Sequence, residues 1–465
     1  MSSGPAAFRR RLQQIKTSSS ASSIGMTPDA VSSDSDIQPE SGFGQPSSSS
    51  MRRTRDHGAR PLARSDTYRQ LTIMINNSHV GLTKALLLLV PVAIAADLLR
   101  LSPVAVFALN LLAVVPLAAM SIYSILALTR NAGALGGLPR AVFGNATELT
   151  LSIVAIYHGK TQLVLAIATG TAAYYSLLVL GASFLHASYG KTDVPFSKTK
   201  SGVLSSLVMA TAFCLTIPTA MSLATDEEDK SRTNPPAAAV DGYALHLSRI
   251  IAVVLFFLFM TYLTFRFLTH KQLFPRNTSA VHANPDSRTN SVLDMNPAGS
   301  ASSLALAAGF AGSAVCTAAC ANSLLRSMSS ATRALHTTEA FTGFVILPLV
   351  ASLAKSVTIC QHARSDGTPA PGQMGRLDFA IRSAMTNVLD TLLFVMPLLV
   401  LLGWIMGRPM ALQLDLFEAV VFLLAVLIMT YLVQHGKTTY FEGFMLIGTY
   451  VSIVVAFYVR PEPIA

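Results

Sequence analysis

Formally charged side chains are scarce in this sequence. They make up 12% of the 465 residues, and 51% of the residues are hydrophobic, whereas an ordinary soluble domain has about 25% charged residues. Cysteines number four and tryptophans one. Cys316 and Cys320 lie one helical turn apart, but no second ligand pair follows at zinc-finger spacing. This composition argues against a soluble globular domain, a disulfide framework and a zinc module, and we expect the cysteines to be buried thiols.

Motifs for chemistry on phosphates or acyl groups are also missing. The sequence has no Gly-rich phosphate loop and no complete nucleophile constellation. We therefore expect a protein that is not an enzyme, uses no cofactor and is not an ATP-driven pump. The net charge of +10 comes from basic residues in tails and short loops without interleaved aromatic residues, so no nucleic-acid partner is expected.

Long apolar runs are what the sequence does contain. About twenty residues of helix, at 1.5 Å per residue, match the roughly 30 Å of bilayer hydrocarbon. Strands in lipid would need alternation of apolar and polar residues, and none is seen. The sequence therefore predicts an all-α integral membrane protein in a lipid bilayer. Its about eleven transmembrane helices cover approximately residues 84–99, 103–124, 138–157, 161–186, 203–224, 248–268, 303–325, 340–361, 379–404, 416–434 and 440–459.

Composition divides the chain into four parts. Residues 1–80 are rich in Ser, Pro and Arg and are predicted to be a disordered cytosolic tail. Residues 84–268 hold the first six spans, 269–302 form a polar cytosolic linker, and 303–460 hold the last five spans. If the first span is an extra helix, five spans lie on each side of the linker. An odd number of spans per half predicts two inverted five-helix repeats.

Lysines and arginines predict the orientation. Every second loop is basic, for example those carrying Arg140, Lys198, Arg364 and Lys437, and basic loops face the cytosol. The N-terminus is therefore expected in the cytosol and the C-terminus in the lumen of an internal membrane. The sequence leaves homo-oligomerisation open.

One acidic residue interrupts the third apolar run. The run begins Gly144-Asn145-Ala146-Thr147-Glu148-Leu149, and a carboxylate inside a span costs at least about 2.5 kcal/mol and marks an ion path. Asn145 and Glu148 are three residues apart and share a helix face, while Gly144 leaves room for close backbone approach. These oxygens are half of a plausible site for a hard cation such as calcium.

This hexapeptide resembles the first signature of the calcium/proton exchanger family. The resemblance extends along most of residues 84–460 through further landmarks, among them Gly136-Gly137-Leu138, Val179-Leu180-Gly181, Thr269-His270-Lys271 and Gln434-His435-Gly436-Lys437. It implies the eleven-span fold, a vacuolar or other endomembrane location, and calcium uptake in exchange for protons. Calcium and protons would be transported ions, with Glu148 as a calcium ligand.

The second family signature is altered. The family has a Gly-Asn-Ala-Ala-Glu-His type of sequence on the eighth span, but the collinear residues here are Ala351-Ser352-Leu353-Ala354-Lys355-Ser356. Lys355 thus stands where the second carboxylate is expected, and Ser352 and Ser356 flank it as further changed positions. Other departures are Ile125-Leu126 and Asn322 at positions that are usually acidic, and Tyr174-Tyr175 at a small polar pair.

The ninth span carries a change of opposite sign. Asp390 stands at a position resembling a family glutamine, with Asn387 three residues earlier on the same face. Asp390 is either an ion ligand or a second partner for Lys355. Glu148, Asp390 and Lys355 together carry one net negative charge, which favours a monovalent cation/proton exchanger as an alternative to calcium/proton exchange. Lys355, Asn322 and the Tyr174-Tyr175 pair suggest a second alternative, a transport-inactive regulatory relative.

Overall fold

The computed structural model describes residues 87–129, 137–231, 237–269, 303–364 and 375–460. The predicted 1–80 tail and nearly all of the 269–302 linker lie outside these ranges, and both remain predictions. Before the linker the elements are α4 (Leu89–Leu98), α5 (Pro103–Leu128), α6 (Gly137–Phe143), α7 (Ala146–Tyr157), α8 (Thr161–Ala173), the π-helix η2 (Tyr174–Val179), α9 (Leu180–Ser188), β1 (Val194–Pro195), α10 (Lys198–Ser231), α11 (Ala237–Thr264) and η3 (Phe265–Thr269).

The second half repeats this order of long helices. Its elements are α12 (Ser303–Ala334), α13 (Glu339–Phe341), η6 (Thr342–Ile346), α14 (Leu347–Ala363), α15 (Arg376–Leu389), η7 (Asp390–Val395), α16 (Met396–Ile405), α17 (Leu416–Val433), β2 (Lys437–Thr438) and α18 (Tyr440–Val459). The π-helical segments η2 and η7 both lie in the middle of a longer continuous helix, residues 161–188 in the first half and 376–405 in the second.

The predicted all-α membrane architecture is confirmed, but the count of eleven spans is not. Within the described residues, nine helices are long and apolar enough to cross a membrane. The first predicted span is represented by the ten-residue helix α4. The third, predicted as one helix over 138–157, is instead two helices, α6 and α7, because the chain breaks at Gly144 and Asn145.

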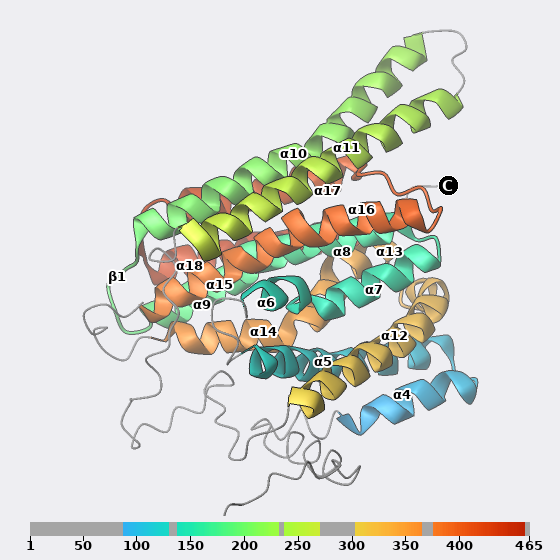
Figure 1. Cartoon of the computed structure of the whole chain (residues 1–465), viewed down its shortest axis with the longest axis horizontal. Helices are drawn as coiled ribbons and strands as arrows, with labels where there is room; N and C mark the ends of the chain where they lie inside the picture. Colours follow the sequence, from blue (N-terminus) through green and yellow to red (C-terminus); the bar gives the residue numbers. More distant parts are fainter. Residues whose placement is uncertain (1–86, 130–136, 232–236, 270–302, 365–374, 461–465) are drawn as a thin grey trace, which may run out of the picture. The chain divides into compact units, whose positions relative to one another are not determined.

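The two halves pack on each other in equivalent ways. Helix α5 lies along its counterpart α12, and α10 along α17. Helix α9 packs on α18 just as α16 packs on α11, and α7 meets α12 as α14 meets α5. Exchanging the halves therefore reproduces these contacts, as two repeats of one unit should. The pair of α5 and α12 can be followed in Figure 1.

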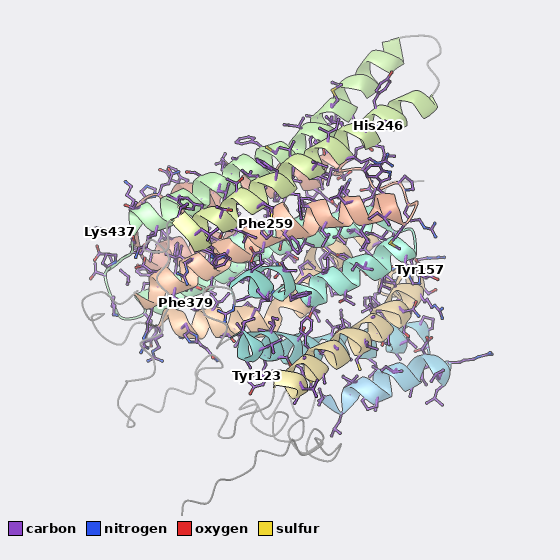
Figure 2. The ribbon with its side chains drawn as sticks, in the orientation of Figure 1. Tyr123, Tyr157, His246, Phe259, Phe379 and Lys437 are labelled. Atoms are coloured by element: carbon purple, nitrogen blue, oxygen red, sulfur yellow. The ribbon has the colours of Figure 1, made fainter. Side chains whose placement is uncertain are left out.

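Loops predicted to face the same way lie at the same end of this helical unit. The loop after α9 pairs with the α17–α18 loop through the short ladder of β1 and β2, and Ser197 N–H there donates to Asp378 at 2.7 Å. At the opposite end Arg408 donates to the Tyr157 carbonyl, and Arg460 pairs with Asp415. Figure 2 shows Lys437 and Phe379 at one end and Tyr157 at the other.

The centre of the unit is the helix formed by α8, η2 and α9. It is the most enclosed of the apolar helices, as expected for a helix that is hydrophobic on all sides. Gly170 on α8 lies so close to η6 that an added Cβ would overlap the Phe344 carbonyl oxygen. This close crossing holds the enclosed helix against the span that carries Lys355.

The prediction of four buried thiols was too broad. Cys320 is buried, but Cys214, Cys316 and Cys360 are partly exposed and none is in a disulfide.

Candidate functional site

The site begins at the break between α6 and α7. A Cβ on Gly144 would overlap the carbonyl oxygen of Arg140, so glycine suits this turn. Asn145 then takes the N-cap position of α7 with non-helical backbone angles, which places Glu148 in the first turn of the helix. The helix dipole stabilises a carboxylate there, and broken helices with termini inside the membrane are typical of ion sites in transporters.

Lys355 of α14 reaches into this break. Its ammonium donates to Asn145 Oδ1 at 2.5 Å and to Glu148 Oε1 at 3.4 Å. It also donates to Asn387 Oδ1 of α15 at 3.4 Å, and the Tyr175 ring centroid lies 6.0 Å away. With side-chain exposures of 10% for Lys355 and 3% for Glu148, the carboxylate is buried and the lysine is nearly so.

Glu148 is held from the other half by a second side chain. Ser352 Oγ donates to Glu148 Oε1 at 2.9 Å, whereas Glu148 Oε2 has no hydrogen-bond partner among the described residues. Ser352 and Lys355 are three residues apart on one face of α14. The structure therefore brings the first signature and its altered counterpart together.

The two signatures differ in backbone. The first half is broken at Gly144, whereas residues 339–363 form one continuous helix through Ala351 and Ser352. Alanine is the strongest helix former, and glycine is disfavoured in a helix interior by about 1 kcal/mol. Ala351, which stands where the first half has Gly144, thus favours a continuous helix in the second half.

Asn387 lies beside Lys355, and Asp390, three residues further along the same span, is the first residue of η7. Asp390 is 7% exposed, and its Oδ1 has no hydrogen-bond partner in the described part of the chain. The charges of Arg266, on η3, and of Lys355 both act on Asp390.

Arg266 was not anticipated from the sequence. Including it, the four formal charges of Glu148, Asp390, Lys355 and Arg266 sum to zero. The count of one net negative charge, which supported a monovalent cation, was therefore incomplete.

The tyrosine pair fills the space beside the site. Both rings are buried and meet edge to face at 5.5 Å. The Tyr174 hydroxyl and Ser356 Oγ are 2.7 Å apart, and because Ser356 itself donates to the Leu353 carbonyl, Tyr174 is the donor. Next to them is a mainly apolar cavity of about 290 Å³ between α9 and α14, with Cys360 in its wall.

Two polar contacts between distant residues were missed. Lys160 pairs with Glu339 at 2.7 Å, and Ser329 also donates to that carboxylate. Ser323, next to the half-buried Asn322, donates to Asp97 of α4 at 2.9 Å. No local pattern signals contacts between residues this far apart in sequence.

Cation chemistry at the site would depend on mixed oxygen donors. The described residues contain no cluster of three or more His, Cys, Asp or Glu that could hold a metal. Glu148 supplies one carboxylate, while Asn145 and Asn387 supply amide oxygens. Hard cations bind such oxygens as ligands. The Lys355 ammonium already donates hydrogen bonds to all three side chains.

A family model described as sodium/calcium exchanger protein matches residues 102–268 and 305–459. The chain is 27% identical over 404 residues to the vacuolar calcium ion transporter of Schizosaccharomyces pombe, covering 85% of this chain and 90% of that protein. It is 30% identical over 386 residues to a Ca²⁺/H⁺ antiporter of Aphanothece halophytica, covering 81% and 96%.

Solved structures show the same fold. Native YfkE superposes with a TM-score of 0.62 at 22% identity, covering 80% of this chain and 97% of that one. The H⁺/Ca²⁺ exchanger CAX gives a TM-score of 0.56 at 14% identity, covering 84% and 89%. At these identities the likeness concerns the fold alone.

Proposed function

Since the chain belongs to the sodium/calcium exchanger protein family, we propose that it is a secondary-active antiporter that moves calcium into a vacuole-like compartment in exchange for protons. The observation that carries this proposal is the buried carboxylate of Glu148, held between the broken helix of one half and the continuous helix of the other. The similarity to proteins named as a vacuolar calcium ion transporter and a Ca²⁺/H⁺ antiporter supports calcium as the cargo.

The proposed cycle uses Glu148 as the shared ligand. When its carboxylate is ionised, Glu148, Asn145 and Asn387 offer oxygens to calcium. A proton arriving from the acidic compartment neutralises Glu148 and releases the ion there. Movement of the two halves relative to each other then exposes the site to the other side, so that the proton gradient drives calcium uptake.

Calcium uptake into acid-inside vesicles that contain the purified protein tests this proposal. We expect uptake that collapses when a protonophore dissipates the gradient, with the S. pombe relative as the positive control and empty vesicles as the negative control. Uptake no greater than in empty vesicles would favour a transport-inactive relative. Uptake of sodium or potassium in place of calcium would favour the monovalent exchanger.

A further inference from the structure

The ammonium of Lys355 occupies the place that cargo needs. It donates to Asn145, Glu148 and Asn387, which are the side chains that the proposed function assigns to calcium. A calcium ion on these oxygens would lie next to a positive charge in a buried site. Calcium binding therefore requires the ammonium to move.

A buried ammonium cannot simply be left without a counter-ion. Removing one partner of a buried ion pair is strongly destabilising, because the remaining charge is uncompensated. Lys355 thus needs a second carboxylate within reach of its flexible four-carbon side chain.

Asp390 meets this requirement. It is buried, its Oδ1 has no hydrogen-bond partner among the described residues, and the charge of Lys355 already acts on it. Lys355 also touches Asn387, three residues before Asp390 along the same span. Arg266 acts on Asp390 as well, and its Nη1 donates to the Tyr262 hydroxyl at 3.1 Å. Lys355 would therefore share Asp390 with a second cation.

We propose that Lys355 is a tethered cation that exchanges partners: it pairs with Glu148 in the empty site and moves to Asp390 when calcium binds. This inference rests on the proposed function for the identity of the cargo. Asp390 is then a positioning residue: by pairing with Lys355 it leaves the oxygens of Glu148, Asn145 and Asn387 free to bind calcium. Asp390 itself is not a calcium ligand.

Thermal unfolding without calcium tests the exchange of partners independently of transport. Either Glu148→Gln or Asp390→Asn leaves Lys355 one carboxylate, whereas the double variant leaves none. We expect the double variant to lose at least about 4 °C more in melting temperature than the sum of the single losses. The excess should vanish when Lys355→Met is added.

The matched control for this cycle combines Glu148→Gln with Glu418→Gln, since Glu418 is another buried carboxylate. The losses of melting temperature caused by Glu148→Gln and by Glu418→Gln should add in the double variant. Failure of the Glu148/Asp390 double variant to fold, when the triple variant with Lys355→Met folds, would also support the exchange. Additive losses for Glu148→Gln and Asp390→Asn would overturn it.

Calcium kinetics in the vesicle assay separate positioning from direct ligation. Asp390→Asn should raise the KM for calcium by about 10-fold with little change in maximal rate, and Asp390→Glu should restore the KM. In a Lys355→Met background Asp390→Asn should change the KM by less than about 2-fold. An equal increase in both backgrounds would make Asp390 a ligand and overturn the proposal. If the unaltered protein moves no calcium, the proposed function fails, and the unfolding cycle alone decides the exchange.

Discussion

At the scale of single residues, Lys355 changes the chemistry of the site most. In the place of a second carboxylate it supplies an ammonium that pairs with Glu148 at 3.4 Å. At an effective dielectric constant near 20, two opposite charges about 4 Å apart attract by about 4 kcal/mol, and the cost of burying both charges offsets much of this. Any cation must therefore compete with a permanently attached one.

Glu148→Gln should lower the rate of calcium uptake by about 10- to 100-fold, because interactions with a charged group contribute about 1.5–3 kcal/mol and the amide carries no charge. Initial rates of calcium uptake into acid-inside vesicles measure the effect. Glu418→Gln, which changes a buried carboxylate of α17, should keep the original rate. An unchanged rate for Glu148→Gln would show that the ion takes another path.

At the scale of elements, close crossings and end contacts position the spans. Gly170 allows α8 to approach η6, and the Asp415–Arg460 pair joins the start of α17 to the end of α18. The α6–α7 span is broken and the α14 span is continuous because the first position of the signature is Gly144 in the first half and Ala351 in the second. Local backbone preferences thus determine which helix presents a free terminus to the site.

Gly170→Ala should destabilise the protein by about 1–3 kcal/mol, the usual cost of overpacking, because the new methyl group meets backbone that cannot rotate away. Thermal unfolding in detergent measures the loss. Gly312→Ala is the control, since a Cβ there meets no atom within 4 Å. Equal stability of the two variants would argue against the close crossing of α8 and η6.

The Asp415–Arg460 contact predicts a pH effect. The hydrogen bonds from Arg460 hold the pKa of Asp415 below its usual value of about 3.9. A carboxyl group with a lowered pKa contributes stability above its unfolded-state pKa, and this contribution is lost as the pH falls through the lower, folded-state value. Arg460→Gln should therefore cost at most about 1 kcal/mol near pH 6, because both side chains are partly exposed.

Melting temperatures between pH 6 and pH 3 test this effect. The difference between the original protein and Arg460→Gln should shrink below about pH 4. Lys437→Gln, which removes the more exposed pair with Asp193, should show little effect at any pH. A difference for Arg460→Gln that stays constant down to pH 3 would contradict the assignment.

At the scale of the whole molecule, the two ends of the helical unit carry different loops. The β1–β2 ladder with Lys437 lies at one end, and the contacts of Tyr157, Arg408 and Arg460 lie at the other. The excess of lysine and arginine predicts that the Lys437 end faces the cytosol. The end of α18 then faces the lumen.

Protease protection in sealed endomembrane vesicles, cytosolic side out, tests this orientation. The protease should remove a tag at the N-terminus. The thiol of the Lys437→Cys variant should react with a membrane-impermeant thiol reagent added outside. A tag after residue 465 should be protected until detergent is added. Accessibility of the C-terminal tag together with position 437 in sealed vesicles would reverse the prediction for α18.

The sequence alone determined the helical membrane architecture, the two groups of spans, and the placement of Glu148, Lys355, Asn387 and Asp390 among the polar residues inside the spans. Hydropathy and helical spacing are local properties, so they can be found without coordinates. Only the tertiary structure decided that Lys355 contacts Asn145, Glu148 and Asn387 together, that Arg266 acts on Asp390, and that Lys160 pairs with Glu339. These contacts join residues on different helices, most of them more than a hundred positions apart, and their geometry depends on how the two halves pack.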